Sequence, residues 1–474
     1  MTAYCMLRRL IGVLGVALIL AIPRAAGAQI RMPGPTLPPN SPFMGGVPTG
    51  TAKSEPIPLS IAEAIRRALE HNLGVLQAEE AVNRSMGARW LALSELLPDV
   101  SGSALESRRK NSLEAFGFPL GPAFPRVVGP YNLFDARVFF KQTVFDASSM
   151  NKLRAETHEL AAARHSYKSA REFVVLVAAD LYLEGLAAQA RAATARAQLE
   201  TAQALQAQAQ DLRQNGIVAG IDVVRAEVRV STERQRTTAA QADFEKIKLQ
   251  LARVMGLPIG QAITLSDQIP TVPIPEMTIE QALERAYRDR PDYLAAQERL
   301  RAAEAARSAA VAERLPSIVL DADYGVIGLT LPSSLATFTL TGTVKVPIFD
   351  GNKTKAHIQQ ATVDLNNRKS EFDDLRAQIN YDVRSAFLDL QATQEELEAA
   401  TQGRELSAQQ LAQARDRFAA GVANNIEVIQ AQEAVALANE QYISAVFGYN
   451  VSKAVLGRAL GTVEEAIAKF LGGK

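Results

Sequence analysis

Apolar side chains recur at seven-residue intervals along two stretches between residues 372 and 456. The first stretch is interrupted only at Arg404. The apolar positions are Val383, Leu390, Leu397, Leu411 and Phe418, followed by Val428, Val435, Tyr442, Tyr449 and Leu456. A seven-residue repeat places such side chains along a seam where two helices wind around each other. Gly421 lies between the stretches and can take the positive φ at which a helix ends. The pattern predicts an antiparallel coiled-coil hairpin that turns at Gly421.

A second pattern is the alternation of apolar and polar residues at 318–324, where Val319 is an exception, and more cleanly at 337–346. The polar positions of the later segment are Thr337, Thr339, Thr341, Thr343 and Lys345. A period of two is typical of a half-buried strand with one apolar and one polar face. The alternation predicts a β-hairpin at about 317–348, and a weaker version predicts another at about 99–145. The loop of this first hairpin, about 108–135, contains four prolines and is expected to be irregular.

The two halves of the chain match each other at nearly constant offsets. Residues 60–65 match 278–283 at an offset of 218. At an offset of 205, the residues Gly216, Ile221, Asp222 and Val223 match Gly421, Ile426, Glu427 and Val428. These matches indicate an internal duplication, with a first repeat at 59–275, a second at 276–461 and a C-terminal tail at 462–474. Each repeat is expected to contain a helix, a β-hairpin and a long helical hairpin, turning at residue 216 or 421.

The helices expected in each repeat differ greatly in length. A first helix is predicted to begin after Ser60, with Glu63 completing a capping box, and to continue to Leu97. The segments 147–215 and 352–420 each run for about 69 residues without proline. At about 1.5 Å per residue, each would extend on the order of 100 Å as one helix. The chain is therefore expected to be mainly α-helical, with a small β part.

The N-terminus carries the pattern of a secretory signal. Arg8 and Arg9 precede an apolar run, and a small-x-small site ends at Ala28, so a signal peptide is predicted at 1–28. A proline-rich linker follows at 29–58. No later run of about 18 apolar residues is evident, and we expect no membrane-spanning helix in the exported chain.

Composition excludes several classes of function. The only cysteine lies in the predicted signal, so the exported chain has no disulfide or thiolate site. Lys and Arg together number 51, as do Asp and Glu, so the charge balance indicates no nucleic-acid partner. Phosphate-loop and dinucleotide fingerprints are absent, and no cofactor is expected. His158 and His165 lie seven residues apart, but without further ligands we interpret them as a surface pair, not a metal site. We therefore expect that the chain is not an enzyme.

The predicted strands are about ten residues long, which suits a strand that crosses a membrane. Four strands cannot close a barrel, and open sheet edges are not tolerated in lipid. Two interpretations therefore remain. Either the strands form an ordinary sheet in water, or several chains close one barrel together.

With these features in this order, the sequence resembles the outer membrane efflux protein family, typified by TolC. The resemblance rests on the signal peptide, the duplication, the Leu-Pro pairs that end the first helix of each half, Phe349-Asp350-Gly351, and the turn Arg417-Phe418-x-x-Gly421. It implies a homotrimer with a twelve-stranded transmembrane barrel in outer-membrane lipid and an α-barrel of coiled-coil helices reaching into the periplasm. It also implies a passive export channel, a periplasmic adaptor protein, and an inner-membrane pump of the RND, ABC or MFS class.

The family resemblance also implies roles for individual residues. Gly216 and Gly421 would lie at the periplasmic tips that contact the adaptor. Asp222, Glu427 and Gln430 would lie at the pore constriction, with an amide replacing one of the acidic residues of the typical member. The tyrosine and arginine that hold the typical tip closed correspond to Phe418 and Ala423, which cannot form the same bonds. The threonines from Thr337 to Thr343, with Lys345, would line the barrel lumen.

Three alternatives stay open at this point. A type I protein secretion channel would have the same fold, whereas a periplasmic coiled-coil scaffold or adhesin would use its strands for assembly. The row of threonines is also compatible with a hydroxyl ladder in a soluble sheet. The sequence favours small-molecule efflux but does not identify a substrate or a pump.

Overall fold

The computed structural model describes residues 38, 40–113, 115, 125–216, 218–267, 277–420, 422 and 425–470. The predicted signal peptide at 1–28, the first part of the predicted linker and the predicted turn residue Gly421 lie outside these residues.

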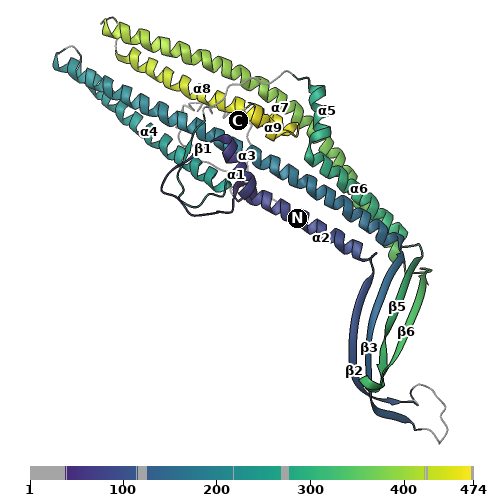
Figure 1. Cartoon of the computed structure of the whole chain (residues 1–474). Helices are drawn as coiled ribbons and strands as arrows, with labels where there is room; N and C mark the ends of the chain where they lie inside the picture. Colours follow the sequence, from purple (N-terminus) through teal and green to yellow (C-terminus); the bar gives the residue numbers. More distant parts are fainter. Residues whose placement is uncertain are drawn as a thin grey trace, which may run out of the picture. The chain divides into compact units, whose positions relative to one another are not determined.

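The helices and strands follow one order twice (Figure 1). The first series is α1 (Ile61–His71), α2 (Leu73–Ser94), β2 (Asp99–Ser112), β3 (Val127–Phe145), α3 (Ala147–Gln214) and α4 (Gly220–Val254). The second series is α5 (Ile279–Asp289), α6 (Pro291–Ala312), β5 (Ser317–Gly328), β6 (Leu335–Lys345), α7 (Lys353–Ala419) and α8 (Asn425–Ala459). With 68 and 67 residues, α3 and α7 confirm the two long helices. A short helix, α9 (Val463–Phe470), lies in the predicted tail.

The long helices pack in antiparallel pairs, α3 with α4 and α7 with α8 (Figure 1). Val383, Val428 and Leu456 of the predicted seam are buried, which supports the coiled-coil interpretation. Arg404, the one break in the repeat, does not disrupt it. Its guanidinium carbon lies 3.8 Å from the centroid of the Tyr442 ring. The cation therefore stacks on an aromatic seam residue of the facing helix, where the attraction between charge and ring replaces an apolar contact.

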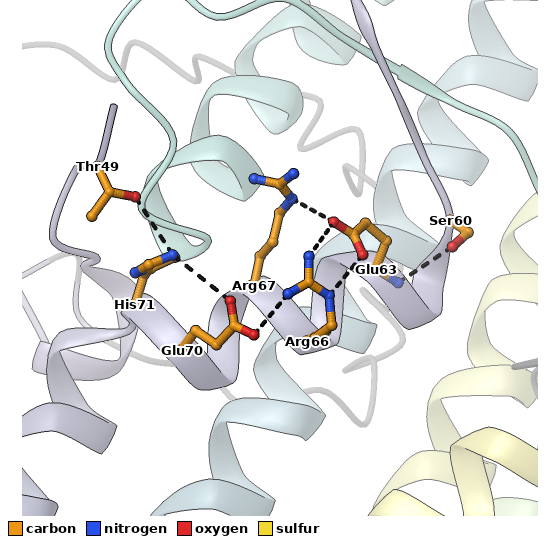
Figure 2. Close-up of polar contacts among 7 residues, drawn as sticks. All are labelled: Thr49, Ser60, Glu63, Arg66, Arg67, Glu70 and His71. Atoms are coloured by element: carbon orange, nitrogen blue, oxygen red, sulfur yellow. Dashed lines mark hydrogen bonds and ion pairs between the residues drawn. The ribbon is translucent and has the colours of Figure 1, made fainter. Parts of the chain in front are cut away.

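The first helix begins as predicted, but its cap is simpler than a capping box. The Ser60 hydroxyl accepts a hydrogen bond from the Glu63 N–H at 3.3 Å. Figure 2 shows the Glu63 carboxylate turned toward two arginines of the same helix, at 2.7 Å from both Arg66 Nη2 and Arg67 Nε. The carboxylate thus forms charged pairs one turn away and does not return to the Ser60 N–H.

The expectation of one helix from Ser60 to Leu97 is wrong. Asn72 lies between α1 and α2 with extended backbone angles, and its side chain accepts a hydrogen bond from the Gly74 N–H at 2.9 Å. An asparagine that caps a new helix competes with continuation of the previous one. In the second series the break falls at Arg290, immediately before Pro291, which favours an extended conformation for the residue that precedes it.

The long strands form a four-stranded antiparallel sheet in the order β2-β3-β5-β6. The second hairpin agrees with the alternation at 317–348. The irregular loop expected at about 108–135 is wrong over much of its length, because β2 and β3 continue to Ser112 and from Val127. A register shift between Arg109 and Asn111 accommodates Pro130, which has no N–H to donate to a ladder.

The main core surrounds the middle of α3. Residues 174–179 of this helix are all buried, and so is Tyr182, whose hydroxyl donates to the Leu59 carbonyl at 2.8 Å. Leu59 belongs to β1 (Ile57–Leu59), which pairs in parallel with β4 (Ile263–Leu265). Near the 3₁₀ turn η1 (Pro42–Met44), the rings of Phe43 and Phe173 meet edge to face at 4.9 Å. The middle of the predicted linker is therefore packed against α3, and its end pairs with β4.

Helix α3 also corrects the expectation that no later segment is apolar enough to cross a membrane. It contains an 18-residue window with a mean hydropathy of 1.5, and 72% of that window is buried within the chain. Packing in the core accounts for this apolar character.

Candidate pore and tip surfaces

The residues predicted to line the barrel lumen lie on one face of the sheet. Thr337, Thr339, Thr341 and Thr343 are the direct cross-strand partners of Gly325, Asp323, Asp321 and Val319, and Lys345 pairs with Ser317. All five are exposed except Thr337, which is half-buried. Because direct partners point to the same side of a sheet, this face, here called the polar face, combines hydroxyls with the carboxylates of Asp321 and Asp323.

The opposite face of the sheet, here called the apolar face, is hydrophobic and uncovered. Six of its side chains are between 53% and 77% exposed: Val100, Val138, Tyr324, Phe338, Leu340 and Val344. The half-buried strand expected from the alternation is therefore not buried within one chain. A contiguous apolar surface of this kind marks contact with lipid or with another protein.

The two outer strands of the sheet are unpaired on one side. In the described part of the chain, β2 pairs only with β3, and β6 only with β5. Each edge therefore presents backbone N–H and C=O groups that lack ladder partners. An apolar face with open edges would be unstable in lipid unless further strands closed the sheet.

The first helical hairpin turns at Gly216, which has a φ of +72°. The N–H of Gly216 bonds to the Arg213 carbonyl at 2.9 Å, which ends α3. Asp222 lies in the first turn of α4, where the partial positive charge of a helix N-terminus favours a carboxylate. Its Oδ1 atom pairs with Arg225 Nη1 at 3.2 Å. The tip thus presents a carboxylate partly balanced within its own helix.

The second hairpin carries its acidic residue at the corresponding place. Gly421 and Ala423 lie outside the described residues, as does the side chain of Phe418. At the turn, the Val422 N–H donates a hydrogen bond to the Arg417 carbonyl at 3.0 Å. Glu427 lies in the first turn of α8, 42% exposed, with its Oε1 atom 3.4 Å from Arg417 Nε. The exposed Gln430 follows one turn later.

Beyond the turns, an ion-pair cluster joins the two hairpins. The Nη1 atom of Arg229 on α4 lies 2.8 Å from Glu433 Oε1 on α8, and its Nη2 atom lies 3.0 Å from Glu233 Oε1. Glu233 has no exposed surface and also pairs with Arg236 Nη1 at 3.0 Å. Sequence reasoning missed this cluster. A signal was present, because Glu233 lies seven residues after Ala226, which is buried on the same helix.

A groove of about 400 Å³ separates α4 from α8 next to this cluster. Its apolar lining includes Val224, Val228 and Ile426, which are 49%, 62% and 42% exposed. Arg225 and Arg229 supply positive charge to its lining. Arg236 and Glu433 also line it, so the groove combines an apolar strip with charges of both signs.

Further from the tips, α3 and α8 carry buried ionisable groups. Burial raises the pKa of Asp180 to about 7, and the nearby Glu184 carboxylate adds to this effect. Burial likewise raises the pKa of Glu172 to about 7. On α8, burial lowers the pKa of Lys453 to about 8.

His158 and His165 are both partly buried and do not form the surface pair that the sequence suggested. His158 Nδ1 lies 2.7 Å from Glu298 Oε2 on α6, and the Nδ1 atom of His165 is buried. Within the described residues, no group of His, Cys, Asp and Glu has the arrangement of a metal site.

Comparisons with known proteins find one matching family model, a curated relative and several solved structures. The family model described as outer membrane efflux protein matches residues 64–257 and 279–462, which are most of both series of elements. The pyoverdine export outer membrane protein OpmQ of Pseudomonas putida is 24% identical over 292 residues. That match spans 60% of this chain and 60% of the relative's length.

Solved structures share the fold at low sequence identity. A membrane protein from Pseudomonas aeruginosa has a TM-score of 0.74 and 20% identity, over 88% of this chain and all of that chain. The outer membrane protein VceC of Vibrio cholerae has a TM-score of 0.72 and 20% identity, over 85% and 96% of the two chains. The CmeC outer membrane channel of Campylobacter jejuni has a TM-score of 0.73 and 16% identity, over 92% and 97%.

Proposed function

The chain belongs to the outer membrane efflux protein family, and we propose that three copies of it form a passive, gated export channel. The fold is mainly helical with a small β part, like that of the outer membrane channels it resembles. In the proposed assembly, the four strands of each chain join those of two others in a twelve-stranded barrel. The helices continue the duct into the periplasm.

The observation that carries this proposal is the exposed apolar face of the sheet. Phe338 and Leu340 are 77% and 66% exposed, on a strand whose outer edge is unpaired within the described chain. Lipid would cover the apolar side chains, and strands from neighbouring copies would satisfy both edges. The polar face would then surround an aqueous lumen lined by Thr337, Thr339, Thr341, Thr343 and Lys345.

The helical part suits the periplasmic portion of such a duct. With 68 residues, α3 would extend on the order of 100 Å at about 1.5 Å per residue. The repeated order and similar lengths of the elements support the proposed internal duplication. Two similar halves per chain would place six helical hairpins around the axis of a trimer.

We propose separate roles for the residues near the hairpin turns. Asp222, Glu427 and Gln430 line the constriction, where carboxylates attract cations and repel anions. The turns at Gly216 and Gly421 contact a periplasmic adaptor. The groove between α4 and α8 supports this assignment, since apolar side chains beside Arg225 and Arg229 suit a helix of another protein.

Small molecules are the cargo we favour. The name of the Pseudomonas putida relative describes export of pyoverdine, and this relative supports small-molecule export over protein secretion. An adaptor and an inner-membrane pump of the RND, ABC or MFS class would supply cargo and energy. We propose no catalytic step for this chain.

The test is to express the full chain, isolate outer-membrane fractions and examine the protein before and after heating. A heat-modifiable trimer that forms discrete conductance steps in a planar bilayer is expected. A protein that stays soluble without detergent, or trimers that never conduct, would contradict the channel and favour a periplasmic scaffold.

A further inference from the structure

An ion-pair network on the polar face of the sheet joins Arg137 to two aspartates. On β3, the Arg137 side chain has Nε 2.7 Å from Asp135 Oδ1 and Nη1 2.7 Å from Asp323 Oδ1 on β5. The three side chains are only 20%, 26% and 15% exposed, although this face of the sheet is open. The guanidinium is therefore held flat against the sheet by one carboxylate from each of two strands.

The direct cross-strand partner of Arg137 is Gly325. A Cβ at Gly325 would collide with the Ala136 carbonyl oxygen and would lie 2.6 Å from both the Cα and the Cγ atoms of Arg137, closer than real side chains approach. The missing side chain therefore makes room for the β3 backbone and for the base of the Arg137 side chain, whose guanidinium reaches Asp323. Glycine weakens a strand interior, and its presence here has a local reason in this close approach.

A second set of charges lies closer to the helices, four residues further along β3. Lys141 on β3 is the direct partner of Asp99 on β2 and of Asp321 on β5. Direct partners share a face, so these three side chains belong to the same polar face as Arg137. Across these rows, the cations come from the central strand β3, while the flanking strands supply only carboxylates. Within the ladder, the four aspartates outnumber Arg137 and Lys141, while Lys345 and Arg109 lie further along the same face.

We propose that this charge ladder, the residues Asp99, Asp135, Arg137, Lys141, Asp321 and Asp323, is a second selectivity element in the lumen, distinct from the tip carboxylates. The inference rests on the proposed function, because it places the polar face inside a conducting barrel. Arg137 is the specificity-determining residue: it offsets two of the aspartates and limits the negative potential of the lumen. Removing it would leave Asp135 and Asp323 without their shared cation and strengthen the preference for cations.

The experiment is the reversal potential of single channels of the full-length protein in planar bilayers under a potassium chloride gradient. Arg137→Gln is expected to raise the ratio of potassium to chloride permeability by about twofold or more, since each chain of the assembly loses one lumen cation. Asp323→Asn is expected to lower the same ratio. Arg137→Lys keeps the charge without the two-armed contact and should restore most of the wild-type value.

Arg108→Gln is the matched control. Arg108 lies on β2 as the direct partner of Asn132. It is an odd number of residues from Asp99, which belongs to the polar face, so its side chain projects from the opposite side of the sheet. This substitution removes the same charge and should leave the reversal potential unchanged.

The outcomes separate the two proposals. Wild-type protein that never conducts would overturn the proposed channel. Channels that conduct normally, but whose permeability ratio is unchanged in both Arg137→Gln and Asp323→Asn, would overturn the charge ladder alone. An equal shift in Arg108→Gln would also overturn it, because the charge would then act without facing the lumen. If Arg137→Gln does not assemble, Asp323→Asn still decides the question: a lowered ratio supports the charge ladder, and an unchanged ratio overturns it.

Discussion

Arg229 on α4 and Glu433 on α8 form an ion pair of 2.8 Å between the two helical hairpins of one chain. The two ends of this pair lie in different surroundings. The Arg229 side chain is 11% exposed and also pairs with the fully buried Glu233, whereas Glu433 is 59% exposed. Arg229 therefore forms ion pairs with one buried and one exposed carboxylate.

The difference predicts unequal costs for the two ends of the pair. Glu433→Gln should lower the free energy of unfolding by less than about 1 kcal/mol, as expected for an exposed ion pair. Arg229→Gln removes a charged partner from buried Glu233 and should cost about 2 kcal/mol. Thermal unfolding of both purified variants measures the difference. Equal losses would contradict the assignment of the buried contact as the stronger one.

Asp180 makes stability depend on pH. Burial raises its pKa to about 7 in the folded protein from 3.8. Between these values the folded chain binds a proton that the unfolded chain does not, so this group reduces stability as pH rises from about 4 to 7. Its Oδ1 atom is buried without a hydrogen-bond partner among the described residues. Asp180→Asn should therefore stabilise the protein at pH 8, by up to about 4 kcal/mol for a shift of this size.

The measurement for Asp180→Asn is the thermal midpoint at pH 4.5 and at pH 8, relative to wild type. The gain should be large at pH 8 and small at pH 4.5. Asp211→Asn, on an exposed position of the same helix, is the control and should show no such dependence. A gain of equal size at both pH values would contradict the titration of Asp180 as its cause.

Replacing glycine by alanine should have opposite effects on stability at two positions of the chain. Gly216 has a φ of +72°, whereas Gly403 lies inside α7, and a Cβ would meet no atom within 4 Å at either place. Gly216→Ala should cost about 1 kcal/mol or more, because a side chain is strained at positive φ. Gly403→Ala should add up to about 1 kcal/mol, since alanine is the better helix former. Thermal midpoints that move in the same direction would contradict this account.

Much of the fold follows from the local pattern of the sequence. The absence of proline locates α3 and α7, the seven-residue repeat locates α7 and α8, and the two-residue alternation locates β5 and β6. Local pattern fails where a single polar side chain changes the outcome. Asn72 caps a new helix where the apolar pattern continues, and Arg404 occupies a seam position by stacking on Tyr442.

The candidate site is less accessible to sequence reasoning because its contacts join distant residues. Asp222 and Glu427 are found from their distance to a turn glycine, which is local information. Arg229 and Glu433 are 204 residues apart, and Arg137 and Asp323 are 186 apart. Their pairing depends on how α4 meets α8 and on the register between β3 and β5, which a single sequence does not specify.

Glu427 provides a test of the proposed constriction. Its carboxylate contacts Arg417 at 3.4 Å and is 42% exposed, so part of its charge faces solvent. Glu427→Ala should reduce the preference of the conducting channel for cations and weaken its block by divalent cations. Arg417→Gln should act in the opposite direction, because it removes the neighbouring positive charge. Bilayer recordings in which neither variant changes selectivity or divalent block would exclude Glu427 from the constriction.

Two adjacent residues of β6 distinguish lipid from water on the two faces of the sheet. Phe338 lies on the apolar face with 77% of its surface exposed, and Thr339 lies on the polar face opposite Asp323. In a membrane barrel, a lysine facing lipid near the bilayer midplane costs about 2–4 kcal/mol, whereas one facing the lumen is solvated. Phe338→Lys should therefore reduce heat-modifiable trimers in outer-membrane fractions, and Thr339→Lys should leave their amount near the wild-type level. If the sheet instead lay in water, Phe338→Lys would be harmless. Equal trimer yields from the two variants would thus count against a lipid-facing apolar surface.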